Sequence, residues 1–196
     1  MPTPFDTTMI NRLIRERRSV FPDQFSDQTI SDEIIKQLLE NANWAPTHKK
    51  TEPWRFFVFA GEARKKLAEA QAEIYKEHTP PAAFKPQKYE KLLKKPLKAS
   101  HIIAIVMRRD PQQRLPEVEE AEAVACAVQN IYLTATAYGI GGYWGSGGIT
   151  YYEAAKEFFG LGEHDRLLGF FYLGYPAQPA PEGRRGAIEE KVTWVE

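Results

Sequence analysis

The stretch EVEEAEAVACAVQNIYLTATAY, residues 117–138, is long enough for about six turns of α-helix. Its middle is small and apolar on nearly every side, with Val124, Ala125, Ala127, Val128, Ile131, Tyr132 and Ala135. A helix on a protein surface carries its apolar residues in one stripe, so this composition predicts a helix buried inside something larger. Gly139 follows the stretch and is expected to end the helix.

Three apolar runs elsewhere in the chain predict the strands of a sheet. They are WRFFVFA (54–60), HIIAIVM (101–107) and RLLGFFYLGYP (166–176). Each run is continuous rather than alternating and is rich in aromatic or β-branched residues. Such runs are typical of strands that are buried on both faces.

Helices are predicted before and between these strands. The first carries Met9, Ile10, Leu13 and Ile14 at helical spacing, and the second begins after the N-cap Ser31 and ends near Ala45. Further elements are expected as helices at 62–78, 87–95 and 151–160, a glycine-rich strand or turn at 140–146, and an edge strand within 187–196. Two helices before any strand fit a doubly wound parallel sheet poorly. The sequence predicts an α+β fold, with a mixed β-sheet sandwiched by helices, in a single domain over residues 1–196.

Length and charge limit the classes of protein to which this chain can belong. Its 196 residues suffice for one domain with a sizeable core, and 43% of them are hydrophobic, as in ordinary soluble proteins. The 26 basic and 26 acidic residues cancel, which disfavours nucleic acid or a membrane as a partner. No apolar signal segment is visible, and Cys126 is the sole cysteine. We therefore expect a cytoplasmic protein without an internal disulfide.

Several motifs that carry chemistry are absent or misplaced. GIGG (139–142) follows a helix and precedes a strand, whereas a dinucleotide fingerprint needs its glycines between a strand and a following helix. WGSGG (144–148) has Trp144 where a nucleophile elbow needs its first glycine. The four histidines show no pairing at a spacing of four, and one cysteine cannot form a cluster, so no metal site is predicted.

Three features remain as candidates for a binding site. Arg17, Arg18 and Ser19 end the first helix and suit a phosphate, although cations at a helix C-terminus also simply oppose its dipole. In NANWAPTHKKTEPW (41–54), Trp44 and His48 are placed to face a flat ligand; alternatively, the indoles belong to the core and the lysines to solvent. The glycines of YGIGGYWGSGG (138–148) suit a close approach of the backbone to a ligand, or else form a loose loop.

Taken in their order along the chain, these features resemble the FMN-dependent nitroreductase family. The shared pattern consists of a first helix ending in Arg-Arg-Ser, Ala-Pro and Pro-Trp around a polar segment, a long buried helix before Gly-x-Gly-Gly-x-Trp, and a late GFFYLGYP. APTHKK (45–50) is similar to the short, single-domain YdjA-like subgroup. The resemblance runs from about Met9 to Trp194.

The resemblance implies where a cofactor would lie. Members of the family are homodimers with two FMN sites in the subunit interface, each built from both chains. Arg17, Arg18 and Ser19 would hold the FMN phosphate and ribityl chain, with Arg185 near the phosphate, and Trp144, Gly145 and Ser146 would line the flavin. Trp44 and His48 would reach the flavin from the partner subunit. Gly139, Ile140, Gly141 and Gly142 would lie near the entrance for NADH or NADPH.

The chain departs from the common family pattern just before the first strand. Many members have Asn-x-Gln-Pro-Trp there, and this chain has Lys50 and Glu52 in place of the asparagine and the glutamine. Those two amides contact the polar edge of the flavin. Lys50 would instead offer a positive charge to that edge.

The implied function is that of an FMN-dependent NAD(P)H oxidoreductase. NADH or NADPH would deliver a hydride to FMN in a ping-pong cycle, and a nitroaromatic, a quinone or a similar acceptor would take it. Two alternatives stay open: a protein that binds or stores flavin without turnover, and a family member that catalyses dehalogenation, enone reduction or flavin fragmentation. The apolar surplus of helix 117–138 and of Trp194 further predicts an intertwined homodimer, whose C-terminal arm (about 177–196) crosses onto the partner.

Overall fold

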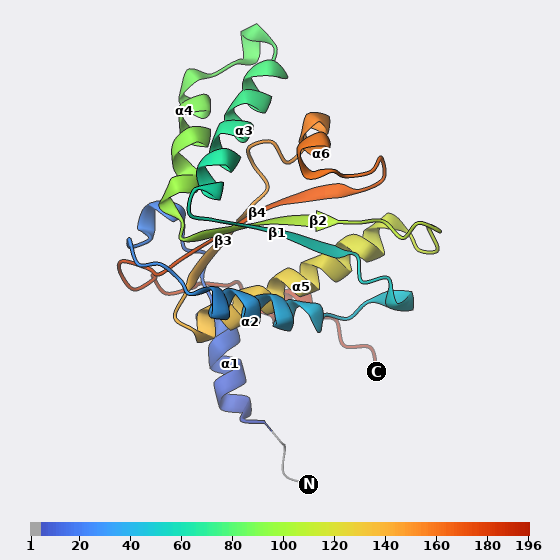
Figure 1. Cartoon of the computed structure of the whole chain (residues 1–196). Helices are drawn as coiled ribbons and strands as arrows, with labels where there is room; N and C mark the ends of the chain where they lie inside the picture. Colours follow the sequence, from blue (N-terminus) through green and yellow to red (C-terminus); the bar gives the residue numbers. More distant parts are fainter. Residues whose placement is uncertain (1–4) are drawn as a thin grey trace.

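One four-stranded sheet forms the centre of the molecule, which the computed structural model describes over residues 5–196 (Figure 1). The strands are β1 (Trp54–Ala60), β2 (His101–Met107), β3 (Gly141–Gly145) and β4 (Arg166–Gly174). They lie in the order β1-β2-β4-β3, and each neighbouring pair is antiparallel. Among the described residues, the parallel component of the predicted mixed sheet is one isolated bridge, between Ser19 and Gly142.

Helices cover both faces of this sheet, which confirms the α+β class. α2 (Asp32–Asn43) and α5 (Glu117–Ala137) lie on one face, and α3 (Ala63–Glu77), α4 (Pro86–Lys94) and α6 (Glu153–Phe159) lie on the other (Figure 1). α1 (Thr7–Glu16) projects from the side of α2 and α5 (Figure 1). Short 3-10 turns lie at Pro22–Gln24, His48–Lys50, Pro81–Ala83, Lys95–Lys98 and Glu189–Lys191.

The side chains of β2 divide the hydrophobic core into two layers. Residues 103, 105 and 107 pack with α2 and α5, and residues 102, 104 and 106 pack with α3 and α6. Successive side chains of a strand point to opposite faces, so a strand that serves both layers has a continuous apolar sequence. The predicted burial of β2 on both faces is confirmed, because each of its residues is buried.

β1 is less buried than its sequence predicts. Arg55 is exposed, and 41% of Val58 is accessible to solvent. The reason is its position, because β1 is an edge strand and pairs with β2 alone within the described part of the chain. The prediction of burial on both faces is therefore wrong for this strand in the single chain.

The C-terminal tail does not form the predicted edge strand. Residues 177–196 are exposed throughout, and their one regular element is the 3-10 turn at Glu189–Lys191. Trp194 is 87% exposed. An extended segment becomes a strand only where a neighbouring backbone supplies hydrogen bonds, and residues 187–196 have no such neighbour in the described chain.

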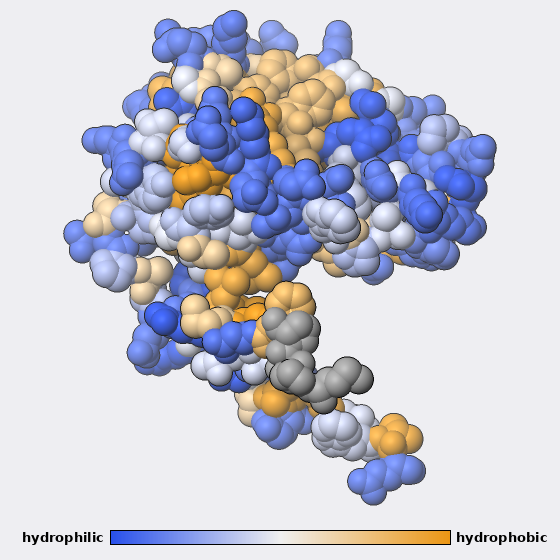
Figure 2. All heavy atoms as spheres, turned by 60° about the horizontal axis from the view of Figure 1, so that its bottom comes forward, coloured by the Kyte–Doolittle hydropathy of each residue, from blue (hydrophilic) through white to orange (hydrophobic). Residues whose placement is uncertain are grey.

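The surface formed by α1 and α5 retains much apolar area. α1 buries none of its residues, and Met9, Ile10 and Ile14 are exposed. α5 buries one side, including Val124 and Ile131, and leaves Glu122, Ala125, Cys126 and Gln129 exposed on the other. Figure 2, in which the side at the bottom of Figure 1 comes forward, shows hydrophobic patches on this face of the molecule. The predicted burial of the long helix thus holds for only one of its sides in the single chain.

Within residues 5–196, none of the helices combines the length and the apolar character that crossing a membrane requires.

Candidate functional site

A cavity of about 540 Å³ lies where α1, α5, β3 and the C-terminal tail meet. It is lined by Ile14, Arg17, Ser19, Ala125, Val128, Gln129, Tyr132, Trp144 and Arg185. Four of these residues, Arg17, Ser19, Trp144 and Arg185, were predicted from the sequence as cofactor-binding. They come from both ends and the middle of the chain, so only the tertiary structure brings them together.

Tyr132 on α5 organises one wall of this cavity. The guanidinium carbon of Arg17 lies 4.6 Å from the centre of the Tyr132 ring. The Tyr132 hydroxyl donates to the Gly142 carbonyl at 2.6 Å and lies 3.0 Å from Ser19 Oγ. Burial raises the pKa of this hydroxyl, which therefore stays protonated and able to donate. The backbone N–H of Val20 donates to the same carbonyl at 2.9 Å, so the segment after α1 is fixed to β3.

The electrostatic character of the cavity is positive. Arg17 and Arg185 line it, and neither Asp nor Glu does. Across residues 5–196, neither arginine forms an ion pair with a carboxylate, and the one hydrogen bond of the Arg185 side chain goes to the carbonyl of Arg184 at 2.7 Å. Two guanidiniums without an acidic partner, next to the hydroxyl of Ser19, suit a phosphate group.

Arg18 points away from this cavity, unlike its two neighbours in sequence. Its Nε donates to the carbonyl of Pro181 at 3.2 Å, and Gly183 packs directly against the guanidinium, which would have to shift to admit a side chain there. Arg18 therefore holds the tail that carries Arg185. The prediction of a direct contact between Arg18 and a phosphate is not supported by this arrangement, because its Nε donates to the tail and its Nη1 donates to the carbonyls of Arg15 and Arg17.

Trp144 connects the first cavity to a second one of about 410 Å³, which is lined by Ala121, Trp144, Ser146, Tyr151 and Leu168. The indole N–H of Trp144 donates to the carbonyl of Leu168 at 3.0 Å, which fixes the ring at the boundary. Gly145 is buried behind it, and its carbonyl lies so close to Gly169 that a Cβ there would be only 2.5 Å away. The two cavities therefore adjoin at Trp144, and Arg17 and Arg185 line only the first of them.

Trp44, His48 and Lys50 lie elsewhere on the molecule and line neither cavity. Trp44 is 79% exposed and donates to Glu40 Oε1 at 3.0 Å, and His48 Nδ1 lies 2.7 Å from Glu119 Oε2. Lys50 is exposed and has a positive φ of 54°. In the single chain these side chains face solvent, so contact with a flavin through a partner subunit stays a prediction.

The segment predicted as the entrance for NAD(P)H is mostly enclosed by its own chain. Ile140, Gly141 and Gly142 are buried, and Gly139 alone is exposed. A Cβ at Gly141 would lie 2.8 Å from the Val20 side chain, and one at Gly142 would lie 2.7 Å from the Phe171 ring. These glycines permit close packing around the start of β3. The segment therefore does not form an open entrance in this chain.

Sequence reasoning missed the three side chains with uncharged polar groups, Gln129, Tyr132 and Tyr151, that line the two cavities besides the predicted residues. Tyr132 was expected only as part of an apolar helix, although its hydroxyl was the one polar group among those core positions and was a usable signal. Gln129 lines the first cavity and Tyr151 the second. Neither carries a local signal, because their roles depend on which segment packs beside them.

Comparison with known proteins relates this geometry to one family. The family model described as the Nitroreductase family matches residues 14–175. YdjA of Escherichia coli strain K12, named for an NAD(P)H nitroreductase activity, is 30% identical over 164 residues, which cover 84% of this chain and 86% of YdjA.

Two solved structures share the fold over the full length of the chain. A nitroreductase-like family protein from Bacillus cereus has a TM-score of 0.80 and 32% identity, covering 100% of this chain and 99% of its own. A protein from Desulfovibrio desulfuricans, described as a nitroreductase in complex with FMN, has a TM-score of 0.68 and 26% identity at the same coverage. From the matched residues and the shared fold together, the chain belongs to the nitroreductase family.

Proposed function

We propose that this protein is an FMN-dependent NAD(P)H oxidoreductase that acts on nitroaromatic, quinone or similar acceptors. One observation carries the proposal. Arg17 and Arg185 line the same cavity and have no acidic partner within residues 5–196, and the Trp144 indole lines both this cavity and the adjoining one. This order of a cationic end followed by an aromatic surface matches the order of the phosphate and the ring in FMN.

The residues of the chain divide the task of binding FMN. Arg17, Ser19 and Arg185 would hold the phosphate and the ribityl chain, and Arg18 would support them by fixing the tail. Trp144 and Ser146 line the second cavity and would flank the ring system, with Gly145 between them in the chain. Tyr132 would keep Arg17 and Ser19 in place through its ring and its hydroxyl.

Bound FMN would supply the redox chemistry by taking a hydride from NADH or NADPH and passing it to the acceptor in a ping-pong cycle. The chain itself would orient the donor and the acceptor and exclude competing reactions. This division of labour explains why the two cavities contain no acid–base pair.

The proposal includes a homodimer with shared FMN sites. Met9, Ile10 and Ile14 on α1 present apolar surface without a partner in the single chain. The unpaired edge of β1 and the exposed, extended tail are further surfaces that a second chain would cover. Trp44, His48 and Lys50 would then reach the flavin held by the partner. A cytoplasmic location is part of the same proposal, supported by the single free and exposed Cys126.

Anaerobic titration of the purified protein tests this function. We expect a yellow protein with one FMN per chain, bleached by NADH or NADPH and reoxidised by nitrofurazone and by quinones. A protein that binds FMN and is not reduced by an excess of either nucleotide would be a flavin-binding or storage protein instead. Reduction followed by transfer only to enones or halogenated aromatics, or by fragmentation of the flavin, would assign another reaction of the same family.

A further inference from the structure

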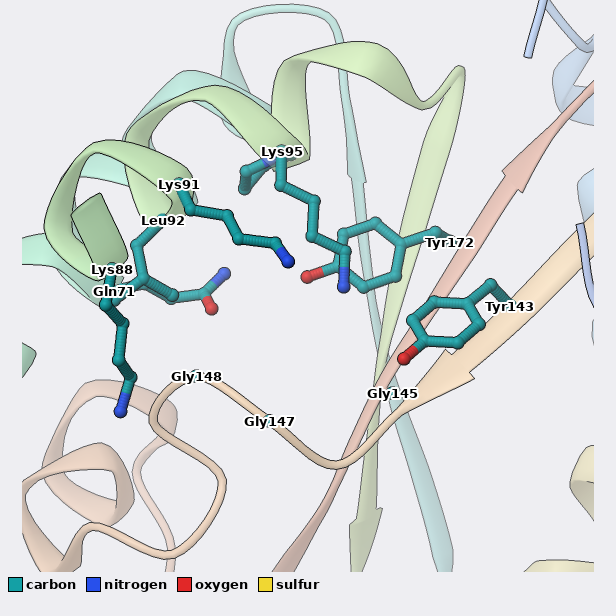
Figure 3. Close-up of a pocket in the computed structure, with 11 residues that line it drawn as sticks. Gln71, Lys88, Lys91, Leu92, Lys95, Tyr143, Gly145, Gly147, Gly148 and Tyr172 are labelled. Atoms are coloured by element: carbon teal, nitrogen blue, oxygen red, sulfur yellow. The ribbon is translucent and has the colours of Figure 1, made fainter. Parts of the chain in front are cut away.

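A separate cavity lies on the opposite face of the sheet, between α3, α4, β3 and β4 (Figure 3). Its volume is about 300 Å³, the lower end of the range for small-molecule sites. On β3, Tyr143 faces this cavity and the adjacent Trp144 faces the candidate flavin site, because successive side chains of a strand point to opposite faces. The two sites therefore open on opposite faces of the sheet, and the segment 145–148 after Trp144 contributes residues to both. This inference does not rest on the proposed function.

Three lysines give the cavity its charge. Lys88, Lys91 and Lys95 line it, and their spacing of three and four residues places them on one side of the α4 segment. No Asp or Glu lines the cavity, and within residues 5–196 none of the three forms an ion pair. Their neighbour Lys94 differs, because it is paired with Glu90 at 2.9 Å.

Gln71 on α3 supplies an independent sign of a ligand. Gln71 is 1% exposed and lies beside the Tyr172 hydroxyl, but its amide nitrogen has no partner at hydrogen-bond geometry among the described residues. Figure 3 shows this amide directed into the same space as the ends of Lys91 and Lys95. A buried hydrogen-bond donor without an acceptor costs free energy. A bound group with an acceptor oxygen at this point of the cavity would remove that cost.

Lys95 is the lysine most strongly affected by its surroundings. Its Nζ lies 4.5 Å from the centre of the Tyr143 ring and 4.4 Å from that of Tyr172. Burial and then repulsion from Lys91 lower the pKa of Lys95 to about 8, against a smaller opposing effect of Asp23. An anion in the cavity would relieve the repulsion between the two ammonium groups.

We propose that this cavity is a binding site for a small anion that carries a phosphate group, either inorganic phosphate or a small phosphate ester. The ammonium groups of Lys91 and Lys95 face the same space (Figure 3), whereas that of Lys88 lies 4.2 Å from the centre of the Tyr75 ring. Two point charges beside a buried amide donor match a compact tetrahedral dianion, whereas a planar carboxylate is matched better by the fork of an arginine. The Gln71 amide would donate a further hydrogen bond to a phosphate oxygen. The tyrosine rings would pack against the body of an ester.

Calorimetric titration of the FMN-saturated protein tests the proposal, because FMN then occupies any phosphate site near Arg17. The probes are inorganic phosphate, glucose 6-phosphate and, as a carboxylate, acetate. We expect saturable binding of at least one of the two phosphates and none of acetate. Tighter binding of glucose 6-phosphate would identify an ester site, and tighter binding of inorganic phosphate would identify a site for the free ion. The absence of saturable binding of either phosphate, or equal binding of acetate, would overturn the proposal.

Substitutions locate the binding. Lys91→Gln and Lys95→Gln should each weaken it about tenfold, since each removes a charge-assisted hydrogen bond. Lys94→Gln is the matched control on the same helix and should bind like the parent. Gln71→Met should also weaken binding while the protein keeps its circular dichroism spectrum. Equal effects of Lys94→Gln and Lys95→Gln would show attraction to the general charge of the helix and would refute a defined site.

Sulfate provides an additional test because its charge is constant near neutral pH. Lys95 is faced by Lys91 on α4, Asp23 in the turn Pro22–Gln24, Tyr143 on β3 and Tyr172 on β4. Since the pKa of Lys95 is about 8, sulfate affinity should fall between pH 7 and 9 in the parent and change less in Lys95→Gln. The same decline in both proteins would remove Lys95 from the site.

Discussion

The guanidinium of Arg17 lies 4.6 Å from the centre of the Tyr132 ring, and the hydroxyl of that tyrosine donates to the carbonyl of Gly142. These two contacts join the end of α1, the middle of α5 and the start of β3. An arginine stacked on an aromatic ring loses little mobility when it binds an anion, because its plane is already set. The geometry of the candidate phosphate site is thus established by the folded chain.

Arg17→Ala should lower the affinity for FMN by at least tenfold. The substitution removes charge-assisted hydrogen bonds worth about 1.5–3 kcal/mol. Ultrafiltration followed by the absorbance of the released flavin measures the effect. Arg12→Ala is the control, since Arg12 lies on the same helix but pairs with Glu16 at 2.9 Å on the exposed surface. If Arg17→Ala retains FMN as tightly as Arg12→Ala, the assignment of the phosphate end is wrong.

Tyr132→Phe should destabilise the protein while leaving a ring under Arg17. The Gly142 carbonyl would lose the hydrogen bond from Tyr132 and keep the one from the Val20 N–H, at a cost of about 0.5–1.5 kcal/mol. Urea unfolding followed by circular dichroism gives the change in the free energy of unfolding. Tyr138→Phe serves for comparison, because within residues 5–196 the Tyr138 hydroxyl forms no hydrogen bond to another side chain. Equal stability of the two variants would contradict the role given to Tyr132.

Glu120→Gln should have the largest effect on stability of the changes considered. Glu120 forms an ion pair with Arg109, and their side chains are only 0% and 9% exposed. A second oxygen of Glu120 accepts the backbone N–H of Asp110 at 2.9 Å, so the pair fixes the start of α5 to the loop after β2. Leaving Arg109 buried without its partner costs about 3–5 kcal/mol. Glu122→Gln, at an exposed position of the same helix, should change the free energy of unfolding little.

Asp110 should contribute to unfolding at low pH. Hydrogen bonds from the Arg114 guanidinium, at 2.7 and 3.1 Å, lower the pKa of Asp110 to about 2 from an ordinary value of 3.8. Because the folded pKa is depressed, this stabilisation is present above about pH 4 and is lost as the pH falls toward about 2. Asp110→Asn should therefore flatten the dependence of the unfolding free energy on pH in this window. Asp27→Asn, which changes an exposed carboxylate, should keep the slope of the parent.

Dilution should release FMN and dissociate the dimer together. In the proposed assembly each FMN contacts both chains, and an obligate interface of more than about 2,000 Å² leaves no stable monomer. Mass photometry and flavin fluorescence, followed in parallel down to nanomolar protein, measure the two events. A monomer that keeps its FMN would refute the shared site and the placement of Trp44 and His48 at the flavin of the partner.

Local patterns in the sequence were sufficient to predict helices α1–α6, strands β1–β4 and part of the candidate site. The spacing of Met9, Leu13 and their neighbours predicted α1, and the continuous apolar run at 101–107 predicted a strand buried on both faces. Arg17 and Ser19 were found because a pair of cations and a hydroxyl at a helix end is itself a local signal. These features depend on residues that are close in sequence, so their physics can be evaluated without the fold.

The tertiary structure decided every feature that depends on which distant segments pack together. Arg18 binds the tail and not the cavity, and β1 is half exposed because it lies at the sheet edge. The basic helix at 87–95 was evident from sequence, whereas its cavity exists only because Gln71 and the tyrosines of β3 and β4 lie opposite three of its lysines. Side-chain periodicity fixes the face on which a residue lies, and the packing of layers determines what that face meets.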